Sequence, residues 1–342
     1  MAIREQSIDL LKGIAVVLMI QVHIIELFAT NEIFIGKLGK LFLFLGGAPV
    51  APLFMIILGY FLTASKKTTK QLLLRGLVLF CLGLILNVLL NLNLIYSVIN
   101  GLYVVDLLPY IFGVDILLFA GLSTLLIVVL RKLLTSSLLL VLILIIVSAF
   151  LGHFLADYAP ETSGLKYLSA FFFGSAKWSY FPLFPWLTYP LVGLMFYQLQ
   201  ITYHWNKSIT KKNKLIIAAV FLLFLLLTFQ YAVSISSNLI LYYHHGLLFC
   251  IWVILFLTFY SFFIHEMNKA IGNSLVLNYL KWLGKNVTAI YIIQWLIIGN
   301  IATELYKTVS SPWHLTGYFF SVLLVSSITI YFWNKLKLVV TV

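Results

Sequence analysis

SIDLLKGIAVVLMIQVHIIELF, residues Ser7–Phe28, is an apolar stretch that carries four ionisable side chains. Its length suits one membrane-spanning helix, since about 20 residues rising roughly 1.5 Å each cross the ~30 Å hydrocarbon core of a bilayer. At about 100° per residue, all four fall within one arc of about 100°; they are Asp9, Lys12, His23 and Glu26. Ionisable side chains are costly to expose to lipid, so this stripe predicts a helix that lines a bundle interior or a wet cavity.

The composition excludes an ordinary soluble globule, because 63% of the residues are hydrophobic and only 9% are charged. We predict an all-α integral membrane protein with one domain over residues 1–342, and we take the first apolar stretch as a retained span. Cys81 and Cys250 lie within apolar segments and form no ligand cluster, and no further ligands stand at metal spacing from His244 and His245. We therefore predict packing roles for the two cysteines and no bound metal. For the two histidines we predict interfacial packing, with binding of an acceptor as the alternative.

Hydropathy predicts about ten transmembrane helices. The fourth is too long for one simple crossing, and Pro109 with Gly113 predicts a bent or re-entrant start. The larger outer loops are residues 29–48 and 155–180. The predicted spans are residues 8–28, 49–65, 72–92, 103–130, 137–155, 182–201, 214–233, 239–264, 287–303 and 313–334.

The positive charge predicts the orientation of the chain. If the N-terminus is cytoplasmic, only five of the 22 Lys and Arg residues fall on the outer side, which leaves 17 at cytoplasmic ends and loops. This asymmetry predicts that both termini are cytoplasmic and accounts for much of the net charge of +12. We expect membrane lipid and no nucleic acid as a partner, since no aromatic-basic motif for nucleic acid is present.

A second group of cations lies where the second predicted span ends and the third begins. It consists of Lys66, Lys67, Lys70 and Arg75. Arg offers a planar fork and Lys a point charge to a phosphate group, so these residues suit a phosphate-bearing ligand. Anchoring to anionic lipid headgroups explains the same charges without a ligand.

The first span, with Lys12 and His23 separated by ten residues, is similar to the basic-x10-His pattern of the membrane acyltransferase-3 family. The sequence IDLLKGIAVVLMIQVH also resembles the start of heparan-α-glucosaminide N-acetyltransferase-like proteins. Further segments resemble these families in order along the chain: FMIILGYFLT with its basic cluster, DLLPYIFGVDILLFAGLS, YFPLFPWLTYPLVG and LGKNVTAIYIIQW.

This resemblance implies that acetyl-CoA or another acyl-CoA enters from the cytoplasm. The acyl group would pass to a hydroxyl or amine of an extracytoplasmic glycan or glycolipid, which makes the chain an O- or N-acetyltransferase of the cell envelope. His23 matches the essential histidine and Lys12 its basic partner, while Arg75 with Lys66 and Lys67 matches the CoA end. The chain departs from the pattern in having Lys at position 12 and Gln294–Trp295 where many relatives have a histidine.

The chemistry of acyl transfer suits a histidine inside the membrane. An acceptor hydroxyl is a weak nucleophile, and a neutral imidazole can take its proton as the thioester is attacked. Glu26, one turn from His23, is the nearest carboxylate that can orient the ring. His23 as a transiently acylated carrier and His23 as a structural residue bonded to a neighbouring helix remain the alternatives.

Four other residues are candidate substrate contacts. Asp9 belongs to the polar stripe, and Asp106 and Asp115 flank the proline-interrupted start of the fourth span. Helix capping or a lysine partner explains these two aspartates equally well. Trp186 either stacks on a sugar or shapes the outer end of the sixth span.

Two other function classes fit parts of the same pattern. A proton-coupled secondary transporter uses buried His and carboxylate side chains, although matching inverted halves with broken helices are not evident. A lipid-binding scaffold needs no turnover. We expect a multi-pass protein of a cell membrane, such as a bacterial plasma membrane.

Overall fold

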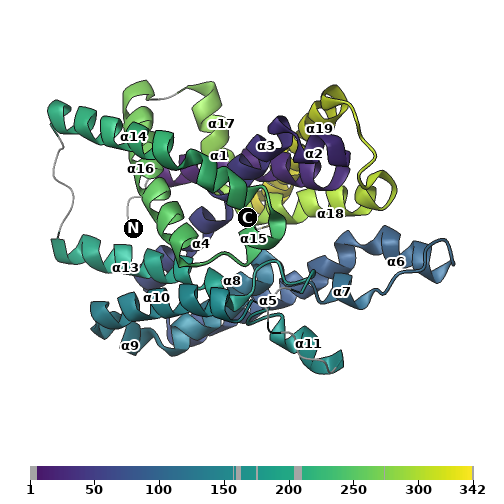
Figure 1. Cartoon of the computed structure of the whole chain (residues 1–342), viewed down its shortest axis with the longest axis horizontal. Coiled ribbons are helices and arrows are strands. Elements are labelled where there is room, and N and C mark those ends of the chain that lie inside the picture. Colours follow the sequence, from purple (N-terminus) through teal and green to yellow (C-terminus); the bar gives the residue numbers. More distant parts are fainter. Residues whose placement is uncertain are drawn as a thin grey trace. The chain divides into compact units, whose positions relative to one another are not determined.

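The computed structural model describes residues 6–156, 158, 163–174, 176–203, 210–272 and 274–340. These residues form α-helices joined by short connections, with two isolated β-bridges, Ala29 to Val309 and Val114 to Ser179. Figure 1 shows the helices in chain order. The prediction of an all-α chain is confirmed.

The helices pack into two compact units, each of which draws on separate stretches of the chain. The first unit takes residues from 1–50, 89–105 and 257–342. α1 is its central helix and packs against α3, α17, α18 and α19 (Figure 1). The helices of this unit are α1 (Gln6–Phe28), α2 (Asn31–Ile35), α3 (Lys37–Gly47), α6 (Leu92–Ile99), the second part of α16 (Leu247–Ile271), α17 (Leu275–Lys285), α18 (Val287–Leu305) and α19 (Pro312–Val340).

The second unit takes residues from 51–88 and 106–256. Its tightest helix pair is α4 against α13, where Gly59 lies on the carbonyl of Pro190 and Gly193 on that of Ile56. The helices of this unit are α4 (Ala51–Ala64), α5 (Thr69–Leu90, apart from its last two residues), α7 (Leu108–Ile111), α8 (Ile116–Val129), α9 (Arg131–Ser136), α10 (Leu138–Phe154), α11 (Ser163–Ser169), α12 (Leu183–Trp186), α13 (Thr188–Tyr203), α14 (Lys211–Ser236), α15 (Leu239–Tyr243) and the first part of α16.

Seven helical segments of the described chain are long and apolar enough to cross a membrane, so the chain has the features of a multi-pass membrane protein. Three further predicted spans correspond to shorter helices: α8 with 14 residues, α10 with 17 and α13 with 16. The count of ten and the orientation of the termini therefore stay predictions. The seven segments are Gln6–Phe28, Lys37–Ala64, Thr69–Leu90, Lys211–Ser236, Leu247–Ile271, Val287–Leu305 and Pro312–Leu336.

Three local expectations need correction. Residues 29–48, expected as a loop, contain α2 and α3, and α3 continues almost directly into α4. Residues 275–285, expected in a cytoplasmic connection, form α17. The predicted span 239–264 divides into α15 and α16. His244 and His245, expected at the outer end of one span, therefore lie in the connection before the spanning helix.

The predicted bend in the fourth span is present. The chain forms the short α7, breaks at Phe112–Gly113, and starts α8 at Ile116. Asn87 on α5, which is 4% exposed, donates its amide hydrogens to the carbonyls of Ile111 (3.0 Å) and Gly113 (2.7 Å). These hydrogen bonds supply a side-chain donor to the carbonyls at the break, where Gly113 O also accepts from Asp115 N at 3.1 Å.

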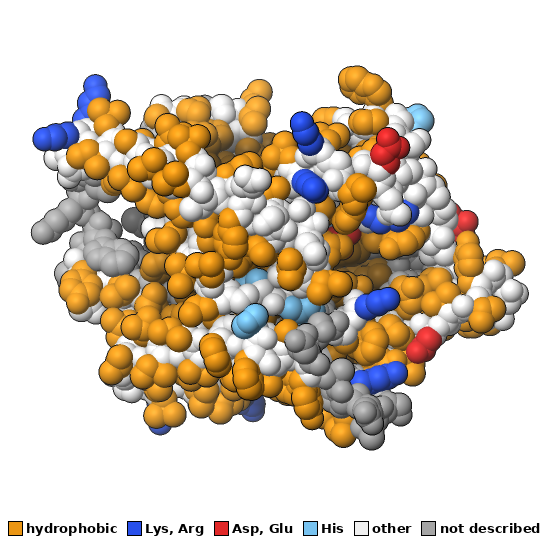
Figure 2. All heavy atoms as spheres, in the orientation of Figure 1, with side chains coloured by type: hydrophobic (Ala, Val, Ile, Leu, Met, Phe, Trp, Pro, Cys, Tyr) orange, Lys and Arg blue, Asp and Glu red, His pale blue; other side chains and the backbone are white. Residues whose placement is uncertain are grey.

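The surface is rich in apolar side chains. Leu226 and Leu227 on α14 are each 74% exposed, and Val104 is fully exposed. Figure 2 shows hydrophobic side chains over much of the visible face. Such a surface is costly in water and suits contact with lipid.

Candidate functional site

His23 is held in place by two consecutive residues of α18. Its Nδ1 lies 3.0 Å from Gln294 Nε2 and 3.3 Å from Gln294 Oε1. The Trp295 ring packs against the imidazole with ring centroids 4.3 Å apart and the planes tilted by 36°. His23 itself is half-buried, whereas Gln294 is fully buried. The ring is therefore fixed at Nδ1 and on one side.

The sequence of α18 explains this placement. Tyr291, Gln294 and Ile298 recur at helical spacing and are buried on one face. A fully buried glutamine amide needs hydrogen-bond partners, because burying an unpaired amide costs about 1–3 kcal/mol. The imidazole of His23 supplies a partner for Gln294.

Glu26, expected to orient the His23 ring, has a different charged neighbour. Gln294 is the side chain that contacts Nδ1 of His23. The Glu26 carboxylate instead interacts electrostatically with Lys307. Burial lowers the pKa of Lys307 below its usual value, and the Glu26 charge opposes this shift. Lys307 Nζ also lies 3.6 Å from the centre of the Phe34 ring.

The backbone places Lys307 next to the end of α1. Lys307 has a positive φ of 59°, and its N–H donates to the carbonyl of Leu27 at 2.8 Å. Val309 N–H donates to Phe28 O at 2.9 Å. The connection between α18 and α19 is thereby attached to the last turn of α1.

Asp9 and Lys12, at the opposite end of α1, form an ion pair. Lys12 Nζ lies 2.9 Å from Asp9 Oδ1, and the two side chains are 16% and 4% exposed. The stripe predicted from sequence thus places these two residues in contact. Because Asp9 is buried, we read the pair first as a structural feature of α1.

The same end of α1 is enclosed by polar side chains from α16 and α17. Lys281, which is 7% exposed, donates to Gln6 Oε1 at 3.2 Å. Ser7 Oγ lies 3.0 Å from His265 Nδ1. We missed these residues because Lys281 resembles an ordinary cytoplasmic cation and His265 stands at the end of an apolar run.

The segment that carries Lys66 and Lys67 has a well-defined local structure. Arg131 donates to the carbonyls of Thr63 (3.3 Å) and Ser65 (2.8 Å), which caps the C-terminal end of α4. Thr68 and Gln71 then form a reciprocal capping box, with bonds of 3.1 and 3.3 Å, that starts α5.

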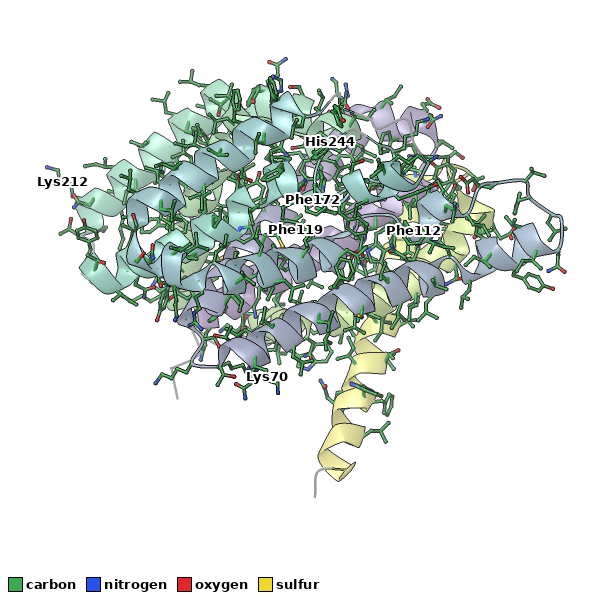
Figure 3. The ribbon with its side chains drawn as sticks, turned by 90° about the horizontal axis from the view of Figure 1, so that it is seen from below. Lys70, Phe112, Phe119, Phe172, Lys212 and His244 are labelled. Carbon is green, nitrogen blue, oxygen red and sulfur yellow. The ribbon has the colours of Figure 1, made fainter. Side chains whose placement is uncertain are left out.

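The predicted phosphate-binding cations lie around this start of α5. Lys66, Lys67, Lys70 and Arg75 are all exposed, and Lys70 lies at the outer edge of its unit (Figure 3). Flexible cations beside the N-terminus of a 22-residue helix suit an anionic group. Arg131, expected from the sequence to be only a cytoplasmic charge, holds the segment that carries these cations.

Asp106 and Asp115 both accept hydrogen bonds from nearby backbone N–H groups. Asp115 Oδ1 accepts from Leu117 N (2.9 Å) and Leu118 N (3.0 Å) as the N-cap of α8. Asp106 Oδ1 accepts from Leu108 N at 3.0 Å. Asp115 is thus a helix cap, whereas the N-cap residue of α7 is Leu107 and Asp106 also interacts with the Tyr167 side chain. Substrate contact by either aspartate stays a prediction.

Trp186 is completely buried, and its Nε1–H donates to the carbonyl of Tyr243 at 2.8 Å. An enclosed indole offers no face to a sugar, so the alternative role of shaping this helix end fits better.

His245 lies beside Trp186 and is 3% exposed. Its Nδ1 is 2.6 Å from Tyr242 O, and its Nε2 is 2.7 Å from Tyr189 Oη. A carbonyl only accepts, so Nδ1 carries the proton and Nε2 accepts from Tyr189.

The predicted site residues divide between the two units. Asp9, Lys12, His23 and Glu26 belong to the first, while Lys66, Lys67, Arg75, Asp106, Asp115 and Trp186 belong to the second. Within the described residues, no three His, Cys, Asp or Glu side chains are grouped so as to hold a metal ion.

Comparison with known families gives one match. Residues 4–225 match the family model described as heparan-alpha-glucosaminide N-acetyltransferase, catalytic. Searches of curated proteins and of solved structures gave no significant match. The matched region contains all the site residues predicted from sequence, whereas Gln294, Trp295 and Lys307 follow it.

Proposed function

The chain belongs to the heparan-alpha-glucosaminide N-acetyltransferase catalytic family, and we propose that it transfers an acetyl group across a membrane. The donor in this proposal is cytoplasmic acetyl-CoA, and the acceptor is a hydroxyl or amine of an extracytoplasmic glycan or glycolipid. The membrane is a cell membrane, such as a bacterial plasma membrane. Family membership favours this function over a proton-coupled transporter.

The observation that carries the proposal is the setting of His23. It lies on an apolar helix long enough to span a membrane, its ring is fixed at Nδ1, and its side chain remains partly exposed. Nε2 is therefore the ring atom left for chemistry with a substrate. A histidine in this arrangement suits general-base catalysis.

In this mechanism, His23 Nε2 takes a proton from the acceptor as the acceptor's oxygen or nitrogen attacks the thioester carbonyl carbon. The carbon–sulfur bond then breaks, and the imidazolium returns the proton to the departing sulfur. Protons and electron pairs balance without any other reagent. If His23 is instead acylated, the acyl group resides on the ring before it reaches the acceptor.

Exposed cations of the second unit suit the phosphate groups of the donor. Lys66 and Lys67 follow the Arg131-capped end of α4, and Arg75 lies on the second turn of α5. Bidentate pairing by Arg75 and point-charge pairing by the lysines are both available to phosphate. Lys12, in its ion pair with Asp9, is a weaker candidate for this role.

The test uses the full-length protein in proteoliposomes, with labelled acetyl-CoA as donor and D-glucosamine as a probe acceptor. We expect acetylated glucosamine from the wild type, a loss of at least 100-fold in His23→Ala, and no loss in the exposed control His314→Ala. Equal transfer by His23→Ala would remove His23 from the mechanism. Label bound to His23 with acetyl-CoA alone would identify an acyl carrier instead of a base.

A further inference from the structure

The contact between Gln294 and His23 places a side-chain amide at one of the two ring nitrogens of the histidine. The two ring nitrogens of a neutral imidazole differ, and the group bonded to one decides whether the other can accept a proton. Gln294 is fully buried, so its amide is confined near Nδ1, and Trp295 packs against the ring. The amide is therefore placed where it can favour one tautomer of the ring over the other.

A glutamine offers two different atoms to Nδ1. When its nitrogen donates to Nδ1, the ring proton stays on Nε2, and Nε2 cannot act as a base. When its oxygen accepts from Nδ1–H, the lone pair of Nε2 is free. Both amide atoms lie within 3.3 Å of Nδ1, so a half-turn of the amide exchanges one state for the other.

We propose that Gln294 is a positioning residue for His23, whose amide oxygen selects the tautomer in which Nε2 takes the acceptor's proton. This inference rests on the proposed acetyl transfer for its catalytic meaning. As Nε2 gains the proton, Nδ1–H keeps its bond to the amide oxygen, and the ring does not turn. Trp295 limits ring rotation during the same step. Glu26, three residues further along α1 than His23, interacts electrostatically with Lys307, which lies before α19.

The chain supplies a matched control on the same helix as His23. Both amide atoms of Gln21 are buried without a hydrogen-bond partner, and its position is about half a turn of α1 away from His23. Gln21→Leu removes a buried amide as Gln294→Leu does, but it leaves Nδ1 of His23 untouched. Any general effect of losing a buried amide appears in both variants.

The kinetic test compares Gln294→Leu, Gln294→Glu and Gln21→Leu in the glucosamine assay. We expect kcat to fall about 10-fold or more in Gln294→Leu, with KM for acetyl-CoA within about twofold of the wild type. Gln294→Glu keeps an acceptor oxygen at Nδ1 and retains most of the rate at high pH. Its negative charge stabilises the imidazolium, so the acidic limb of its pH–rate profile moves to higher pH. Gln21→Leu keeps the wild-type profile.

A spectroscopic test is independent of activity. In protein labelled with [15N]histidine, the His23 signals are assigned by their loss in His23→Asn. We expect a proton on Nδ1 in the wild type and in Gln294→Glu, and a mixture of tautomers in Gln294→Leu. A wild-type proton on Nε2, or a Gln294→Leu spectrum and kcat equal to those of Gln21→Leu, overturns the inference. If the wild type transfers no acetyl group, the proposed function fails while the spectra still decide the positioning role.

Discussion

Gly13 on α1 lies directly against the main-chain carbonyl oxygen of Leu280 on α17, and a Cβ atom at position 13 would overlap that oxygen. One turn of α17 further on, Gly284 meets the carbonyl of Asp9 in the same way. Two glycines thus bring the backbones of α1 and α17 together next to the Asp9–Lys12 ion pair.

We expect Gly13→Ala to destabilise the protein by about 1–3 kcal/mol, because neither backbone can move aside cheaply. Thermal unfolding in detergent measures the effect. Gly317→Ala is the control. Apart from its chain neighbours and its own helix backbone, no atom lies within 4 Å of a Cβ at that position in α19, and alanine is about 1 kcal/mol better than glycine in a helix. Equal melting temperatures for the two variants would contradict the close approach.

Lys12→Met removes the cation that lies 2.9 Å from the buried Asp9 carboxylate. We expect a loss of unfolding free energy on the order of 3 kcal/mol, a similar loss in Asp9→Asn, and a double variant less impaired than the sum. Thermal unfolding of all three variants measures this coupling. An acetyl-CoA-induced stabilisation that vanishes in Lys12→Met but persists in Asp9→Asn would assign Lys12 to the donor, as the sequence predicts.

Arg75→Ala is expected to abolish most of the stabilisation that acetyl-CoA gives the wild type. A ligand at 100 times its Kd stabilises the folded state by about 2.7 kcal/mol, which thermal unfolding detects readily. Lys212→Ala is the control, because Lys212 is an exposed cation far from Lys70 in the same unit (Figure 3). An equal shift in both variants, or one produced equally by phosphatidylglycerol alone, would assign the cations to lipid.

His245 makes stability depend on pH. Burial lowers the pKa of His245 from 6.5 to about 4, because the enclosed ring cannot be solvated when charged. Above pH 6.5 the His245 ring is neutral in both the folded and the unfolded protein, so its contribution to the free energy of unfolding is constant. As the pH falls from about 6.5 to about 4, the unfolded chain binds the proton first, so folding loses on the order of 3 kcal/mol.

Thermal unfolding at pH 7 and pH 5 checks this sign. We expect His245→Phe to be less stable at pH 7 but to lose less stability on acidification than the wild type. His314→Phe, at an exposed histidine, should keep the wild-type pH dependence. A wild-type melting temperature that rises between pH 7 and pH 5 would rule out a dominant role for His245.

Asp115 allows capping and substrate contact to be separated. Asn is as good an N-cap as Asp, so we expect Asp115→Asn to keep the stability of the wild type and Asp115→Ala to lose about 1 kcal/mol. Acetyl transfer should follow the same order. If Asp115→Asn is stable yet inactive, the carboxylate contacts substrate, which is the alternative predicted from the sequence.

Local sequence patterns predict the helical class and part of the first helix well. The length of Ser7–Phe28 gives a spanning helix, and i,i+3 spacing puts Asp9 beside Lys12. Pro109 and Gly113 correctly indicate the break before α8. Each of these features depends on residues that lie near one another in the chain.

The partners of His23 could not be predicted in this way. Gln294 is 271 residues from His23 in the sequence, and no periodicity links the two. α17 has only 11 residues and three polar interruptions, so a hydropathy window built for spans misses it. Lys281 looks like a solvent-facing cation until α17 is placed against α1. Tertiary packing, rather than helix propensity, decides these contacts.

The α18 residue that bonds to His23 lies outside the part of the chain by which the family is recognised. The region that identifies the family ends at residue 225, within α14, whereas the amide that holds the imidazole stands at position 294. A shortened chain that ended near residue 225 would keep the region matched by the family model and lose the amide that bonds to His23. A match to that region alone therefore does not show whether a protein carries the residues that hold this histidine in place.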